Sequence, residues 1–292
     1  MTVRAILMGL VFALMWSSAF ATARIIVADA PPLFSLAARF ALTGVLAITL
    51  ARIMGQSWHL PGGWRGPQAR AVLIFGLCQN ALYLGLNFVA MQWIEGSLAA
   101  IIASSMPLMV AGLGWAFMGQ RTSVLGILGL VTGMAGVALI MGSRLSGGAD
   151  GLGIALCVLG ALALAIATLT VRGASGAGNL LMIVGLQMLV GSVSLALVAL
   201  AIETPHLTFS FRWLAAFLYQ CFVPGLAATL IWFSLVRQIG AVRAATFHFL
   251  NPAFGVAIAA VLLGEHINGT DLIGVAIAML GILMVQMERA RT

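Results

Sequence analysis

Long, nearly uninterrupted apolar runs constrain this chain more than any other feature. Hydrophobic residues make up 62% of its 292 residues, and charged residues make up only 7%. A soluble domain carries about 25% charged residues, so this chain has too little polar surface to cover a globular core. A disordered chain would be rich in charge and poor in large apolar side chains. The runs therefore predict an integral membrane protein.

Ten of the runs are long enough to cross a bilayer as helices, which takes about 20 apolar residues. The expected spans are residues 5–26, 33–53, 71–94, 97–118, 123–142, 151–171, 180–202, 213–236, 242–263 and 271–287. Their short connections leave no room for a soluble catalytic domain, and helices satisfy backbone hydrogen bonds within each span. The first run also resembles a signal peptide, because Arg4 precedes it and Ala19-Phe20-Ala21 resembles a cleavage site.

An internal repeat favours a true first span. A shift of 145 residues aligns the two halves without a gap. It places Pro107 on Pro252, Gly119 on Gly264, Gly129 on Gly274 and Gly136 on Gly281. Each half holds five spans, and because five is odd, the second half crosses the membrane in the opposite sense. We therefore expect an all-α integral membrane protein with ten transmembrane helices in two five-helix inverted repeats, residues 1–145 and 146–292, that form one transporter domain.

The charges indicate membrane topology rather than a polyanionic partner. All 14 basic side chains are arginines, and they are scattered between the apolar runs. No basic stripe exists to bind nucleic acid. With both termini in the cytoplasm, ten arginines fall on the cytoplasmic side and three on the outer side, as the positive-inside rule predicts. The absence of lysine excludes a Walker A loop and a Schiff base, so ATP hydrolysis by this chain is not expected.

Cysteine and histidine give no sign of catalysis or metal binding. Cys78, Cys157 and Cys221 lie singly within apolar runs, with no disulfide or zinc spacing. The four histidines are far apart in the sequence. We therefore expect no enzyme, no metal and no cofactor. A membrane enzyme or a structural membrane component stays as an alternative.

Three stretches carry the pattern of a known family. Trp16-Ser17-Ser18-Ala19-Phe20 lies in the first span and Arg39 in the second, and Pro252, Gly264-Glu265, Gly274 and Gly281 lie in and after the ninth. They resemble the drug/metabolite transporter superfamily in its EamA-type branch, and most of all the YddG-type exporters of aromatic and other amino acids. The resemblance implies efflux across the bacterial inner membrane through a cavity shared by both halves. Gln120 departs from the pattern, because the second half has Glu265 at that place.

Polar residues within spans are the natural candidates for a cavity, because they are expensive to expose to lipid. Asn80, Tyr83 and Asn87 fall on one helical face, and Arg39 could hold a carboxylate through two hydrogen bonds. The expected substrate-binding residues are Trp16, Arg39, Asn80, Tyr83, Asn87, Gln187, Tyr219, Phe247, His248 and Asn251, and Phe20, Gln220 and Pro224 are further possibilities. Packing between helices is the alternative for each polar residue, and Arg39 could instead extend to the outer surface.

Proline and glycine suggest where helices bend and where they pack. Pro107 and Pro252 are the expected hinges. Glycines along residues 126–136 predict close packing between the fifth and tenth spans, with a dimer interface as the second reading. A monomer is expected, and a dimer is not excluded.

The missing acidic residues bear on the substrate. No Asp or Glu lies deep in a span, whereas a carrier of lipophilic cations usually needs a buried carboxylate. We therefore expect a secondary exporter of neutral or zwitterionic amino acids that works by alternating access. An exporter of drugs or other small metabolites is the alternative, and a channel is the remaining rival.

Overall fold

The computed structural model describes residues 2–57, 63–94, 99, 102–142, 150–174, 179–263 and 269–287. Glu95, Gly264 and Glu265, which the sequence singled out, lie outside these residues. The elements of the first half are α1 (Val3–Asp29), α2 (Pro32–Ile53), η1 (Gly63–Arg65), α3 (Pro67–Phe75), η2 (Gly76–Leu84), α4 (Gly85–Ala90), α6 (Met106–Met118) and α7 (Val124–Gly142). Those of the second half are α8 (Gly151–Ala174), α9 (Leu180–Ile202), α10 (Phe211–Gln220), η3 (Cys221–Ala227), α11 (Ala228–Ile239), α12 (Ala241–Ala245), η4 (Thr246–Leu250), α13 (Asn251–Leu263) and α14 (Gly269–Met287).

Among the described residues, seven helices are long and apolar enough to cross a membrane. Residues 3–29, 32–53, 67–90, 151–170, 180–202, 211–239 and 269–287 form them, and two shorter apolar helices cover residues 102–118 and 124–140. Large apolar side chains such as Val45, Leu128 and Leu200 are exposed on their outer faces. Exposure of this kind suits a lipid solvent, so the expected all-helical membrane class is confirmed.

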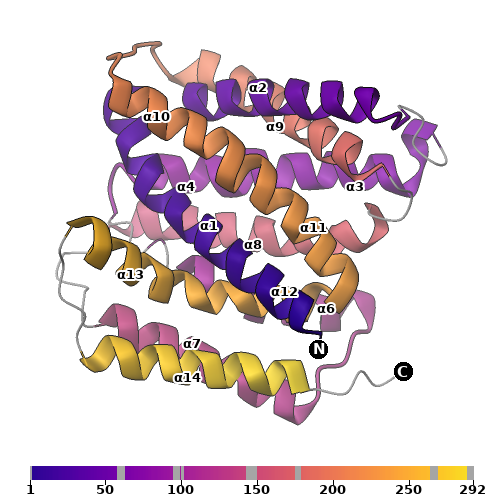
Figure 1. Ribbon diagram of the computed structural model, residues 1–292, viewed down its shortest axis with the longest axis vertical. Coiled ribbons are helices and arrows are strands. Elements are labelled where there is room, and N and C mark those ends of the chain that lie inside the picture. The colour runs from indigo at the N-terminus through magenta and orange to yellow at the C-terminus, as the bar shows by residue number, and fades with distance from the viewer. Residues whose placement is uncertain are drawn as a thin grey trace.

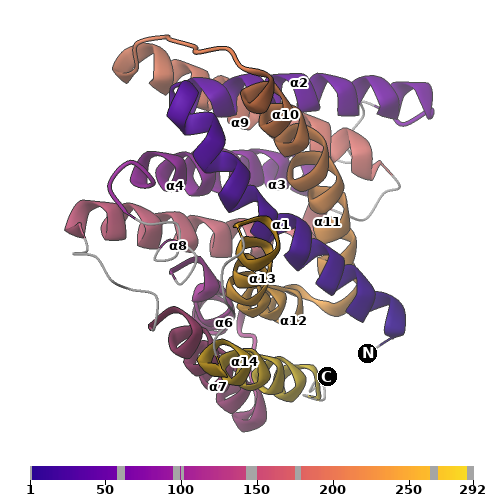
Figure 2. The ribbon, with the colours of Figure 1, turned by 60° about the vertical axis from the view of Figure 1, so that its left-hand side comes forward.

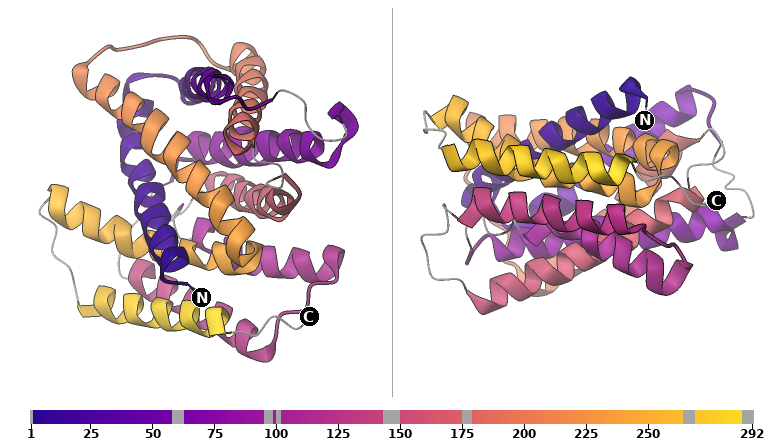
Figure 3. Two further views of the ribbon diagram at one scale, coloured as in Figure 1. Left: turned by 45° about the vertical axis from the view of Figure 1, so that its right-hand side comes forward. Right: turned by 90° about the horizontal axis from the view of Figure 1, so that it is seen from below.

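Two pairs of helices form the ends of the molecule. Figure 1 shows α2 beside α9 at one end of the long axis and α7 beside α14 at the other, and Figure 2 shows the same order after rotation. The helices α1, α3–η2–α4, α8 and α10–η3–α11 lie between the two pairs. The described ends of the chain, at the start of α1 and the end of α14, lie on the same side of the molecule (Figure 3).

Glycine lets α7 and α14 touch through their backbones. A Cβ added at Gly136 would lie 2.6 Å from the carbonyl oxygen of Gly274 and 2.4 Å from the amide nitrogen of Ala278. A Cβ at Gly281 would lie 2.5 Å from the carbonyl oxygen of Gly129. No side chain larger than hydrogen fits at these positions, so the predicted close packing of these helices is present.

The α2–α9 pair is held at both ends by side-chain caps. The Glu203 carboxylate, just beyond α9, accepts hydrogen bonds from the amides of Leu33 and Phe34 in α2, each at 2.9 Å. Gln56 Oε1, just beyond α2, accepts from the amide of Met182 in α9 at 3.1 Å. Each helix therefore satisfies free amides of its first turn with a residue that follows the other helix. The negative charge of Glu203 also suits the positive end of the α2 dipole.

Two central helices contain a π-helical segment. η2 begins at Gly76 and η3 begins at Cys221, positions that are 145 residues apart. Pro224 inside η3 cannot donate a backbone hydrogen bond, which accounts for the irregular backbone there. π-helical turns widen a helix and commonly occur at functional sites. Both segments carry side chains into the region described next.

Candidate functional site

A pocket of about 380 Å³ opens between α1, α2, η2–α4 and α10–η3. It lies in the half of the membrane region away from the chain termini, beside the later turns of α1 and α4. Its lining residues are Trp16, Ala19, Phe20, Ala23, Arg39, Tyr83, Leu84, Asn87, Phe88, Met91, Gln220 and Pro224. A volume of this size is typical of sites for small organic ligands.

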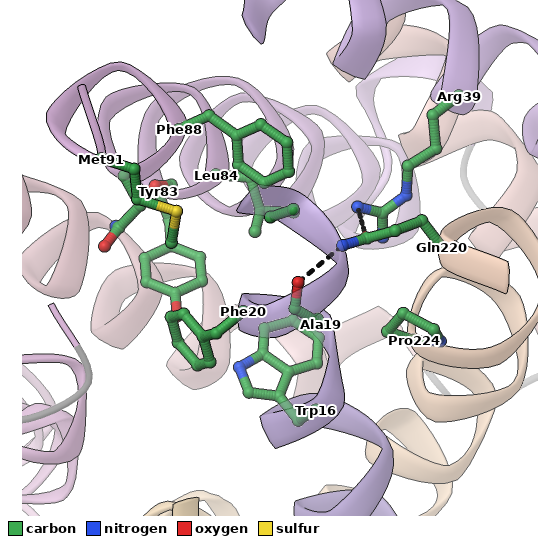
Figure 4. A pocket seen from close by; sticks show the side chains of 12 residues that line it. Trp16, Ala19, Phe20, Arg39, Tyr83, Leu84, Phe88, Met91, Gln220 and Pro224 are labelled. Carbon is green, nitrogen blue, oxygen red and sulfur yellow. Dashed lines mark hydrogen bonds between the residues drawn. The ribbon is translucent and has the colours of Figure 1, made fainter. Parts of the chain in front are cut away.

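Arg39 is the charged group of this pocket. Its side chain is only 4% exposed, and one guanidinium nitrogen, Nη1, donates to Gln220 Oε1 at 2.6 Å. In the part of the chain that the structure describes, its Nε has no acceptor and no carboxylate pairs with it. Figure 4 shows the guanidinium reaching toward Gln220 at one edge of the pocket. The arginine therefore lies in the pocket and is not extended to the outer surface.

Gln220 is oriented by α1, which fixes the partner of Arg39. The Gln220 Nε2 group donates to the carbonyl oxygen of Ala19 at 2.7 Å and to Thr22 Oγ1 at 2.9 Å. Both donors of the amide are thereby used, so its oxygen faces Arg39. This arrangement positions the guanidinium but does not neutralise it, because an amide oxygen carries no net charge.

Aromatic rings form the opposite walls of the pocket. The rings of Trp16 and Tyr83 stack with centroids 6.2 Å apart and planes inclined by 10°. Phe20 and Met91 lie on the same side in Figure 4, away from Arg39. Such walls suit an apolar or aromatic group, and their faces attract a cation such as an ammonium.

Asn87 lines the pocket with part of its hydrogen-bonding capacity already used. Its Nδ2 donates to the carbonyl oxygen of Tyr83 at 2.8 Å, and its Oδ1 lies 3.4 Å from the thiol of Cys157 in α8. The structure therefore places four of the expected residues around one cavity, Trp16, Arg39, Tyr83 and Asn87.

A second, smaller pocket of about 180 Å³ lies on the other side of Trp16, toward the chain termini. Its lining residues are Phe12, Trp16, Gln79, Leu164, Thr229, Trp232 and His248. Trp16 lines both pockets, so its indole separates them.

His248 lies within a cage of aromatic rings beside this second pocket. Its ring is edge-on to Phe12, Trp16 and Trp232, with centroids 5.3, 6.0 and 5.3 Å away. Asn251 lies on the turn after it, with its Nδ2 3.0 Å from His248 Nδ1, and the hydroxyl of Ser17 donates to Asn251 Oδ1 at 3.3 Å. Asn251 therefore orients the imidazole and does not itself line either pocket.

The remaining predicted binding residues make contacts between helices. Asn80 donates to both the side-chain and the main-chain oxygen of Gln187, which joins η2 to α9. Phe247 is buried against Gly9 of α1. Tyr219 is 37% exposed, and its hydroxyl lies 2.7 Å from that of Ser18.

Both expected hinge prolines stand just after a change in helix geometry. Pro252 is the second residue of α13 and follows the 3₁₀ turn Thr246–Leu250. Pro107 is the second residue of α6 and follows a turn at Ser105. Their carbonyl partners one turn back are free of the missing proline N–H.

Sequence reasoning overlooked several lining residues. Phe12, Leu84 and Leu164 are ordinary apolar residues with no distinguishing pattern. Gln79 had a usable signal, because it is a polar residue within a span next to Asn80. Trp232 also had one, since it stands 145 residues after Asn87. Among the described residues, no group of three or more His, Cys, Asp or Glu side chains could hold a metal ion.

Comparison with known proteins places the whole chain among membrane transporters. The model of the EamA-like transporter family matches residues 3–142 and 151–287. The uncharacterized transporter YvbV of Bacillus subtilis is 24% identical over 93% of this chain and 88% of its own length. The uncharacterized inner membrane transporter YedA of Escherichia coli is 27% identical over 97% and 91%, and the protein PagO of Salmonella typhimurium is 24% identical over 94% and 90%.

A solved crystal structure shares the fold. It aligns with a TM-score of 0.79 at 19% identity and covers 97% of this chain and 96% of the other.

Proposed function

Since the chain belongs to the EamA-like transporter family, we propose that it is a secondary transporter that exports neutral and aromatic amino acids across the bacterial inner membrane. The single observation that carries the choice of substrate is Arg39, a buried cation that lines the larger pocket. The membrane transporter class follows from the family, whose members are transporters and not enzymes.

A buried guanidinium without a carboxylate partner is costly. A substrate carboxylate bound there would supply the missing charge and accept two N–H groups in parallel. The neighbouring rings of Trp16 and Tyr83 would hold the side chain, and their faces would favour the ammonium. An amino acid fits these three features together.

An exporter of drugs or other small metabolites is the second candidate. The apolar walls and the volume of about 380 Å³ would admit such molecules. The pocket holds no carboxylate among its lining residues, so a cationic drug would meet Arg39 without a counter-charge. This charge pattern favours the amino acid.

We propose further that ten spans form two inverted five-helix repeats, residues 1–145 and 146–292. The α7–α14 contacts support this. Exchange of the halves by 145 residues turns the contact between Gly129 and Gly281 into one between Gly274 and Gly136, and both are present. The π-helical segments at Gly76 and Cys221 follow the same relation. Such a two-fold axis lies in the membrane plane of many secondary transporters and supports alternating access.

The distribution of charge supports an orientation with both termini in the cytoplasm. Arg4 begins α1, Arg52 ends α2, and Arg237 and Arg243 stand at the junction of α11 and α12. These ends lie on the side of the chain termini (Figure 1). Arginine collects on the cytoplasmic side of membrane proteins.

Counterflow in proteoliposomes tests the substrate class. Vesicles loaded with unlabelled phenylalanine should take up labelled phenylalanine without ATP. Threonine should compete, while phenethylamine, which lacks the carboxylate, and a cationic dye should not. Competition by the dye without competition by any amino acid would select the second candidate instead.

A further inference from the structure

The residues of the two pockets are related by the same shift of 145 residues. Among the lining residues of the smaller pocket, Leu164, Pro224's counterpart Gln79, Thr229 and Trp232 correspond to Ala19, Pro224, Leu84 and Asn87 of the larger one. Four of seven lining positions therefore have a counterpart in the other pocket. The second pocket stands where the other half of the chain would repeat the first.

Unpaired hydrogen-bond donors distinguish the smaller pocket. Trp232 is 2% exposed and its Nε1–H, among the described residues, finds no acceptor. His248 is 1% exposed, and its Nε2 likewise finds no partner in the described part of the chain. Because Asn251 Nδ2 can only donate to His248 Nδ1, the proton of a neutral imidazole is on Nε2. Both free groups are therefore donors.

Two buried donors without acceptors cost free energy that a ligand oxygen would recover. Their rings lie 5.3 Å apart between centroids, so one small group can approach both. Arg39 has no equivalent here, because the residue at the matching position of the second half is Val184. The smaller pocket thus offers neutral N–H groups where the larger offers a charged guanidinium.

We propose that the smaller pocket is a second substrate subsite, open toward the chain termini in the alternate conformation, where Trp232 and His248 hold the carboxylate of the substrate. This inference rests on the proposed function. Trp16 divides the two subsites, so movement of its indole lets the carboxylate pass between Arg39 and the neutral donors. The weaker, uncharged subsite would release or accept the substrate on that side more readily.

Two matched cysteine variants test the proposal. In a chain with Cys78, Cys157 and Cys221 replaced by serine, Leu84→Cys reports on the larger pocket and Thr229→Cys on its counterpart. A membrane-impermeant thiol reagent is added on the side of the termini. We expect it to modify Thr229→Cys, and we expect saturating phenylalanine to slow the modification.

Trp232→Phe tests the chemistry, because it removes the N–H and keeps a ring. It should raise the phenylalanine concentration for half-protection of Thr229→Cys about tenfold. Trp213→Phe is the matched control, since Trp213 Nε1 also lacks a partner within the described ranges but lines neither pocket. It should leave protection unchanged.

The outcomes separate the two claims. If phenylalanine protects Leu84→Cys but not Thr229→Cys, or if Trp232→Phe protects at the wild-type concentration, the second subsite is wrong and the proposed function stands. If phenylalanine protects neither position and is not transported, the proposed function fails and this inference fails with it.

Discussion

Arg39 shows how a single residue can define a substrate class. It is held by Gln220, which α1 orients, and it faces the pocket without a carboxylate partner among the described residues. Sequence alone identified it as a charge within a span but left its direction open. Direction depends on how α2 packs against α10, a tertiary feature that local sequence does not encode.

Replacement of Arg39 should weaken binding of amino acids. We expect Arg39→Gln to lower the affinity of the purified protein for phenylalanine about tenfold or more, because a charged pair of hydrogen bonds is lost. Arg39→Lys should recover part of the affinity, since it keeps the charge but loses the planar fork. Equilibrium binding of labelled ligand measures both.

The control for this prediction is Arg212→Gln, which removes an exposed arginine outside the pocket. Phenethylamine provides a second check. It should bind weakly to the wild type, and Arg39→Gln should not weaken it further. A variant that binds phenylalanine with wild-type affinity would show that Arg39 does not recognise the carboxylate.

Asn80 belongs to helix packing, although it shares a helical face with Tyr83. Its amide is committed to Gln187 of α9. We expect Asn80→Ala to destabilise the protein by about 1–3 kcal/mol, because a buried amide partner is left unsatisfied. Thermal unfolding in detergent measures the effect, and Tyr219→Phe, at a half-exposed hydroxyl, should change it little. An unchanged melting temperature for Asn80→Ala would contradict this role.

At the scale of elements, the sequence predicted the spans and the close α7–α14 pair but not their internal irregularities. Apolar length fixes where a helix crosses lipid, and glycine spacing fixes where two helices touch. The π-helical turns of η2 and η3 depend on neighbours. A Cβ at Gly76 would lie 2.6 Å from the carbonyl oxygen of Gln187, so the approach of α9 and not the local sequence explains that glycine.

The α7–α14 contact gives the prediction at this scale. Gly136→Ala should destabilise the protein by about 1–3 kcal/mol, because its methyl group would meet backbone atoms of α14 that cannot yield. Gly112→Ala in α6 is the matched control, since nothing lies within 4 Å of its Cβ position. Thermal unfolding of the two variants compares them. Equal stability would mean that the two helices do not touch as described.

At the scale of the whole molecule, two helix pairs flank a central group that contains both pockets. The sequence predicted the membrane class and the family, because composition and motifs extend over the chain. It could not tell which polar residues share a cavity, because this depends on the rotation of each helix. Asn87 and Gln220 met across 133 residues of chain, whereas Tyr219, beside Gln220, faces outward.

Alternating exposure of the central region is the main claim about the whole molecule, and exchange across a membrane tests it most directly. Efflux of labelled phenylalanine from proteoliposomes should saturate with concentration and should accelerate when unlabelled phenylalanine is present outside, with no ATP and no ion gradient. Efflux that neither saturates nor responds to external phenylalanine would indicate a channel and contradict the account.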